Sequence, residues 1–169
     1  YTVYTPYKNK WIENYQHKKP VALVSNSNFF QNLIPFASLE ELGIKKSKIK
    51  VQDYNLSQIY KYPEERDFPG VDSTSYLSPH LRFGTVSVRT VISKLTKNDK
   101  VFMSELIWRE FFMQILFHFP KVVSDNFRSK YDGIEWLNNS EDFKHWCNGT
   151  TGYPMVDAGM RQLNKTGYM

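Results

Sequence analysis

The stretch VFMSELIWREFF, residues 101–112, decides how this chain is interpreted. With a helical step of about 100° per residue, it is apolar nearly all the way round, which is typical of a helix at the centre of a domain. The same stretch carries the charged residues Glu105, Arg109 and Glu110. A charge in a buried helix is costly unless it is paired or used. The pattern therefore predicts a central helix whose charges need an explanation.

One face of this predicted helix gathers polar and aromatic side chains within roughly a third of its circumference. Its members are Phe102, Glu105, Trp108, Arg109 and Phe112. Glu105 and Arg109 are four residues apart, close enough to form an ion pair that holds the helix against its neighbours. The alternative is the polar floor of an aromatic cavity. There Trp108 would stack on a base, and Arg109 would contact a phosphate or a base edge.

Start and stop signals of further helices flank this stretch. Ser78 and Pro79 predict a helix that either runs through Gly84 or breaks there and restarts with Ser87 as its cap. No alternating run predicts a sheet, so the expected fold class is all-α. The remaining signals delimit the central helix from Asn98 or Asp99 to about Phe119, a short helix from Ser140 to Gly149, and a last helix from Pro154 to near Gly167.

The N-terminal part differs in character. Residues 1–52 are expected to be an interdomain arm and linker, and residues 53–169 a helical domain. Residues 1–20 are aromatic and basic without a clear period. SLEELG at 38–43 predicts a short helix with Ser38 as its cap and Gly43 as its stop. The chain starts without Met and stops directly after a helical pattern, so we expect it to be a piece of a longer protein.

The composition argues against several classes of protein. The chain is 41% hydrophobic and 16% aromatic, which argues against disorder. No apolar run approaches the roughly 20 residues of a membrane span, so no membrane partner is expected. Cys147 is the single cysteine, which excludes an internal disulfide and favours a reducing, cytoplasmic location. One Cys and four scattered His give no zinc-ligand spacing. A net charge of +5 with many aromatic residues is compatible with nucleic-acid binding.

Five motifs together resemble one known family. They are YTPYKNKW (4–11), YPEERDFPG (62–70), TSYLSPHLRFG (74–84), SELIWREFF (104–112) and TGYPMVDAGMRQLNKTGYM (151–169). In this order they resemble the DNA photolyase and cryptochrome family, and SELIWREFF is most similar to class I cyclobutane pyrimidine dimer (deoxyribodipyrimidine) photolyases. The resemblance implies the first part of a helical FAD-binding domain, preceded by an interdomain arm. We expect the antenna domain and the rest of the flavin cradle to be absent from this chain.

The resemblance also implies which residues bind FAD. Phe102 matches a position that is often Trp, so it keeps the ring but lacks the N–H donor. From the residues alone, an ordinary helix cap with a turn is the favoured interpretation of the loop at 74–78, although a helix N-terminus suits an anion. The implied cofactor-binding residues are Tyr62, Thr74, Ser75, Tyr76, Leu77, Ser78 and Phe102.

A second set of residues is implied to contact DNA or to carry electrons. The resemblance assigns Glu105 to the edge of the damaged base and Trp108 to the face of the dimer, with Arg109 and Phe112 beside them. Arg66 matches a DNA contact, and its ordinary alternative is a solvated surface arginine. Trp136 matches the outermost tryptophan of an electron-transfer chain, and its alternative is a structural role.

The resemblance implies light-driven repair of pyrimidine dimers in DNA by electron transfer from reduced FAD in the full-length protein. We expect a monomer that acts on DNA containing pyrimidine dimers, with an antenna chromophore held by a domain absent here. This chain alone is expected to be inactive. One alternative is a cryptochrome-type photoreceptor without repair activity, and another is a helical nucleic-acid-binding module without flavin.

Overall fold

The computed structural model describes residues 1–17 and 35–169, so the part of the expected linker at 18–34 lies outside the described residues. Within the described ranges there are helices and turns but no strands, which confirms the all-α prediction. The α-helices are α1 (Tyr4–His17), α2 (Tyr62–Glu65), α3 (Leu77–Phe83), α4 (Val88–Ser93), α5 (Lys100–His118), α6 (Ser140–Asn148) and α7 (Pro154–Thr166). Short 3-10 turns lie at Ile59–Lys61, Pro120–Val123 and Ser129–Tyr131.

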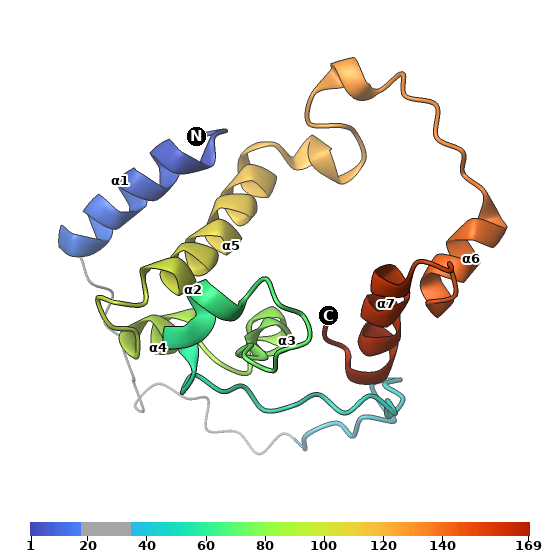
Figure 1. Cartoon of the computed structure of the whole chain (residues 1–169), viewed down its shortest axis with the longest axis horizontal. Coiled ribbons are helices and arrows are strands. Elements are labelled where there is room, and N and C mark those ends of the chain that lie inside the picture. The colour runs from blue at the N-terminus through green and yellow to red at the C-terminus, as the bar shows by residue number, and fades with distance from the viewer. Residues whose placement is uncertain (18–34) are drawn as a thin grey trace.

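Helix α5 is the long central helix that the opening stretch predicted (Figure 1). Helix α1 lies along one side of it, and α2, α3 and α4 lie on another side. Helices α6 and α7 form a separate pair, joined to α5 by a long segment with little regular structure. The chain end after α7 returns toward α3 (Figure 1).

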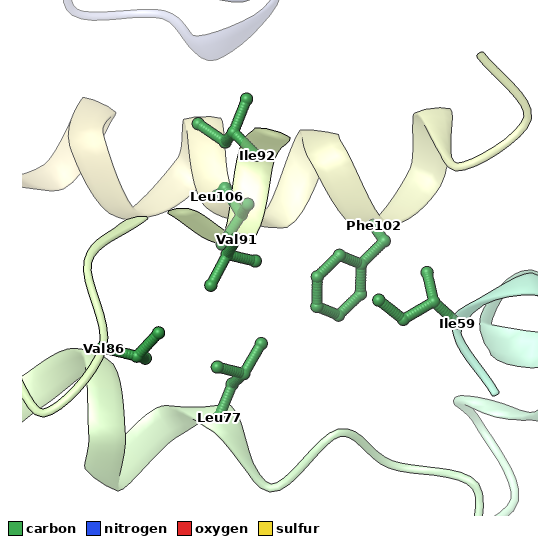
Figure 2. Close-up of a cluster of buried hydrophobic side chains, with 7 residues drawn as sticks. All are labelled: Ile59, Leu77, Val86, Val91, Ile92, Phe102 and Leu106. Atoms are coloured by element: carbon green, nitrogen blue, oxygen red, sulfur yellow. The ribbon is translucent and has the colours of Figure 1, made fainter. Parts of the chain in front are cut away.

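The hydrophobic core lies between α3, α4 and α5. Figure 2 shows its buried side chains, with Phe102 of α5 beside Ile59 at one end and Val86, Val91 and Leu77 toward the other. Val91 is fully buried. Because Phe102 lies in this core, one edge of the core is also positioned to form the wall of a site on α5.

The helix start and stop signals predicted from the sequence are found in the structure, with small displacements of the helix boundaries. The chain breaks at Gly84, which has a positive φ of 70°, and restarts with the Ser87 hydroxyl accepting from the amide of Arg89. This is the second of the two predicted alternatives. Helix α3, however, begins at Leu77, so Ser78 lies inside the first turn and is not its cap. Helix α6 is capped by the side chain of Asn139, which accepts from two first-turn amides.

The N-terminal arm contains a helix that its sequence was not expected to form. Tyr4, Tyr7, Trp11 and Tyr15 recur at helical spacing along α1, and three of these rings contact α5. The aromatic residues therefore serve as the apolar face, a role usually filled by aliphatic residues.

The segment at 38–43 forms a single turn and not the short helix that was expected. Ser38 and Glu41 form a reciprocal pair of side-chain bonds to each other's amides, 2.7 and 3.2 Å long. Gly43 ends the turn with a φ of 71°.

Candidate functional site

A cleft of about 680 Å³ lies between α2, the loop after it, the start of α3, the inner face of α5 and the C-terminal end of the chain. We call this space the cleft. It gathers most of the residues that the sequence had indicated, although they come from segments far apart in the chain. These residues are Tyr62, Arg66, Thr74, Ser75, Tyr76, Leu77, Ser78, Phe102, Glu105 and Arg109.

One wall of the cleft is the loop that leads into α3. Tyr76 has a left-handed backbone with a φ of 53°, which is uncommon for a residue other than glycine. Its hydroxyl donates to the carboxylate of Asp72, and this bond raises the pKa of Tyr76. The carbonyl of Ser75 accepts from the amide of Asn55 over 2.9 Å. The loop is therefore held on both sides, with the hydroxyls of Thr74, Ser75 and Ser78 among the groups that line the cleft.

Another part of the cleft lining is aromatic. Tyr62 and Phe102 meet edge to face, with ring centroids 5.2 Å apart and planes at 88°. Phe102 is 5% exposed and belongs to the hydrophobic core. The same residue lines the cleft. Burial raises the pKa of Tyr62, and the negative charge of Glu105 raises it further.

Two charged side chains that line the cleft, Arg66 and Glu105, form an ion pair. The guanidinium of Arg66 donates from Nη1 to Oε1 of Glu105 over 2.6 Å. The same guanidinium lies 5.7 Å from the centre of the Tyr62 ring. This hydrogen bond to Glu105 raises the pKa of Arg66. Arg66 thereby joins the aromatic wall to the polar floor supplied by α5.

The ion pair between Glu105 and Arg109, one of the two alternatives that the sequence left open, does not form. Arg109 makes no ion pair with any residue in 1–17 or 35–169. It lines the cleft together with Glu105. The partner of Glu105 comes from another segment because the turn after α2 brings Arg66 against α5, a contact that helical spacing cannot indicate.

Three of the indicated residues do not line the cleft, namely Trp108, Phe112 and Trp136. Trp108 points toward α1, where it stacks on Tyr4 with centroids 3.4 Å apart and planes at 7°. Phe112 lies beside Trp108, at 5.5 Å and 22°. Trp136 is 70% exposed and lies in the segment between α5 and α6. The DNA and electron-transfer roles of these three residues stay predictions.

Two lining residues, Asp72 and Gln162, were not indicated by the sequence. Asp72 holds the Tyr76 hydroxyl, and Gln162 reaches the cleft from α7. Tyr168, just beyond α7, packs against Tyr76 with centroids 5.1 Å apart. No local signal marks Gln162, since only the packing of the C-terminal segment brings it to α3. The spacing of the α1 aromatics, in contrast, was a readable signal for the helix that covers Trp108.

Neither a metal-binding cluster nor a membrane-spanning helix is found among the described residues. Within residues 1–17 and 35–169, no three His, Cys, Asp or Glu side chains are grouped so that they could hold a metal ion. None of the helices in these ranges is both long and apolar enough to cross a membrane. The residues that line the cleft carry hydroxyls, aromatic rings and a few charges.

Known proteins are similar to this chain in sequence. A family model described as the FAD binding domain of DNA photolyase matches residues 102–169. The deoxyribodipyrimidine photo-lyase of Halobacterium salinarum is 34% identical over all of this chain and 41% of its own length. The enzyme of the same name from Vibrio cholerae is 33% identical over all of this chain and 42% of its own length.

A solved structure is similar as well. The crystal structure of a bacterial class III photolyase from Agrobacterium tumefaciens superposes with a TM-score of 0.61 at 40% identity. That match covers 66% of this chain and 25% of the other. The chain therefore spans less than half the length of each of these relatives.

Proposed function

This chain belongs to the DNA photolyase family, and we propose that the protein containing it repairs cyclobutane pyrimidine dimers in DNA in the light. The observation that carries this proposal is the cleft, which is lined by residues with hydroxyls, rings and charges from three separate stretches of the chain, 62–81, 102–109 and 162–169. In the proposal, bound FAD in its reduced form supplies the electron for opening the dimer. The residues of this chain bind and orient the cofactor and the DNA.

The donors that line the cleft suit a dinucleotide cofactor. Thr74, Ser75 and Ser78 line the cleft, and their hydroxyls can donate hydrogen bonds to phosphate oxygens. The rings of Tyr62 and Phe102 offer an apolar surface to the rest of such a molecule. Since the chain spans only part of its relatives, we expect this piece alone to bind FAD weakly and to be inactive.

The charged side of the cleft suits damaged DNA. The carboxylate of Glu105 can accept a hydrogen bond from a base edge, and Arg66 holds that carboxylate in place. Arg109 offers a cation to a phosphate or a base. Trp108 lies outside the cleft on the face of α5 turned toward α1, and its partly exposed ring is proposed to stack on an extruded base. Extrusion costs least where base pairing is already damaged, which gives selectivity for the lesion.

Finer assignments remain part of this proposal. We infer class I chemistry on cyclobutane dimers, although one similar structure is named a class III photolyase. A monomer in a reducing, cytoplasmic location is also expected, together with an antenna chromophore held outside this chain. The relatives named above are photolyases, which favours repair over the signalling role of a cryptochrome-type photoreceptor.

The decisive experiment uses the full-length protein that contains this chain. Loaded with reduced FAD and illuminated, it should restore an oligonucleotide that carries one thymine dimer, measured by chromatography of the strand. A dark sample and a sample without protein are the controls. Flavin binding without repair would assign the protein to the photoreceptor alternative, and absence of flavin would leave only a helical nucleic-acid-binding module.

A further inference from the structure

One face of the Trp108 indole is covered by a residue from another element. Tyr4 of α1 lies parallel to it, with ring centroids 3.4 Å apart and planes at 7°. The remaining aromatic neighbours come from α5 itself. Phe111 meets the indole edge to face at 5.5 Å, and Phe112 lies beside it at 5.5 Å and 22°. Trp108 still keeps part of its surface exposed.

Tyr4 is itself fixed at its far end. Its hydroxyl donates to the backbone carbonyl of Ser104 over 2.8 Å and lies 2.7 Å from the Ser104 hydroxyl. Ser104 lies one helical turn before Trp108 on α5. The tyrosine is thus held at its tip by the same helix whose tryptophan it covers, and its ring has little freedom to tilt.

This arrangement restricts the indole more than packing within α5 could. A tryptophan on an exposed helix face can rotate about two side-chain bonds, and ordering it costs conformational entropy when a ligand binds. Here the parallel ring blocks rotation toward α1 and sets the plane of the indole before any ligand arrives. A ring already in a fixed plane binds a planar partner with less entropy loss.

We propose that Tyr4 is a positioning residue, which presents the Trp108 indole in the orientation needed to stack on an extruded pyrimidine dimer. The proposal rests on the function proposed above, and it gives the N-terminal arm a part in lesion recognition. Helix α1 would then affect which DNA is bound, in addition to packing against α5.

The structure offers a matched control for this proposal on the same helix. Tyr7 also places its ring against α5, 5.3 Å from Phe111, and it is partly buried like Tyr4. It makes no stacking contact with Trp108. Leucine at position 4 removes the aromatic contacts with Trp108 and Phe111, and leucine at position 7 removes the contact with Phe111. Only the change at Tyr4 uncovers Trp108.

The test measures two quantities in the full-length, flavin-loaded protein, namely the melting temperature and the ratio of affinities for dimer-containing and undamaged duplexes. Tyr4→Leu should lower that ratio by about three- to tenfold, the range expected for losing one aromatic pair. Tyr4→Phe keeps the ring and should restore most of the ratio. Tyr7→Leu should also lower the melting temperature but leave the ratio within about twofold of wild type.

The outcomes separate this inference from the function on which it rests. A wild-type protein with equal affinity for both DNAs would contradict both. A wild-type protein that discriminates, with an unchanged ratio in Tyr4→Leu or an equal loss in Tyr7→Leu, would contradict the positioning role alone. Should Tyr4→Leu fail to fold, Tyr4→Met takes its place. In a Trp108→Leu background, a further loss of the ratio on changing Tyr4 would likewise overturn the proposal, because Tyr4 acts through Trp108.

Discussion

Arg66 donates a hydrogen bond to the carboxylate of Glu105 over 2.6 Å, and this contact joins residues 39 positions apart. Both side chains keep more than a third of their surface exposed, at 39% and 37%. Solvent therefore screens the pair, and exposed pairs of this kind contribute little to stability. The contact orients Glu105 in the cleft and leaves Arg109, one turn further along α5, outside any ion pair with the described residues.

Separating the Arg66–Glu105 pair should affect DNA binding more than folding. Glu105→Gln removes the charge but keeps the shape, so the melting temperature of the full-length protein should change only slightly. Affinity for dimer-containing DNA should fall by about tenfold, since a carboxylate acceptor at a base edge is lost. Titration of DNA into Glu105→Gln, Arg66→Gln and the double variant measures the coupling. A large drop in melting temperature with unchanged affinity would show that the pair is structural.

Arg109 should contribute a cation to the DNA contact. Arg109→Ala should reduce the slope of log affinity against log salt concentration by about 1, as expected for the loss of one phosphate contact. Arg109→Lys keeps the charge and should keep the slope, which makes it the matched control. Binding measured at four or five salt concentrations gives the slope. Parallel lines for wild type and Arg109→Ala would place Arg109 away from the phosphates.

Substitutions at Gly149 and Gly152 compare backbone strain alone with backbone strain plus a steric clash. Both have positive φ, at 63° and 86°, so alanine at either should cost about 1–2 kcal/mol in backbone strain. A Cβ at 149 would also lie 2.8 Å from the carbonyl oxygen of Asp157, whereas one at 152 would meet nothing within 4 Å. Chemical denaturation should therefore show a clearly larger loss of stability for Gly149→Ala. Equal losses would mean that the helix pair α6–α7 relaxes around the new methyl group.

Asp157 should make the α6–α7 pair sensitive to acid. Its buried carboxylate accepts from the hydroxyl and the amide of Thr151, both over 2.7 Å, and from the amide of Gly152. The side-chain bond from Thr151, with the backbone bonds, lowers the pKa of Asp157 below its ordinary value of 3.8. The unfolded state then binds the proton first as the pH falls. This stabilisation is complete above the ordinary value and is lost as the pH falls through the lowered one.

The measurement for Asp157 is stability against pH. The melting temperature of the wild type should fall below about pH 4. The melting temperature of Asp157→Asn should be lower at neutral pH and should change less over that range. Thr151→Val, which removes the hydroxyl donor but keeps the amide, should fall between the two. At about pH 3 the proton concentration is roughly an order of magnitude above that at the ordinary pKa of Asp. A wild-type melting temperature that stays constant down to that pH would contradict the lowered pKa.

Trp136 should affect the flavin's redox state and not DNA binding. It is 70% exposed and lies outside the cleft, which fits the surface end of an electron path. Trp136→Phe should slow photoreduction of oxidised flavin in the full-length protein by about tenfold or more, while affinity for dimer DNA stays unchanged. Trp146→Phe is the control, since Trp146 is also partly exposed, at 45%, and stacks on Phe143. Equal photoreduction rates in both variants would leave Trp136 without this role.

Local physics made much of this fold predictable from the sequence. The apolar circumference of residues 101–112 specified a central helix, and Gly84, Ser87, Gly149 and Gly167 marked breaks that the structure shows. Such signals act within one turn, because a cap or a positive φ is a property of neighbouring residues. The family motifs then indicated which side chains would line one site, and most of them do line the cleft.

Tertiary packing decided which of those side chains are partners. Spacing along α5 suggested Arg109 for Glu105, but the turn after α2 brings Arg66 closer. Tyr4 could not be linked to Trp108 from the sequence, since the contact depends on how α1 lies along α5. A sequence determines helices through interactions a few residues apart, whereas these contacts span 39 and 104 positions and form only when separate helices pack. The sequence alone thus determined the elements and the residue types of the site, and the packing of α1 and α2 on α5 decided its pairings.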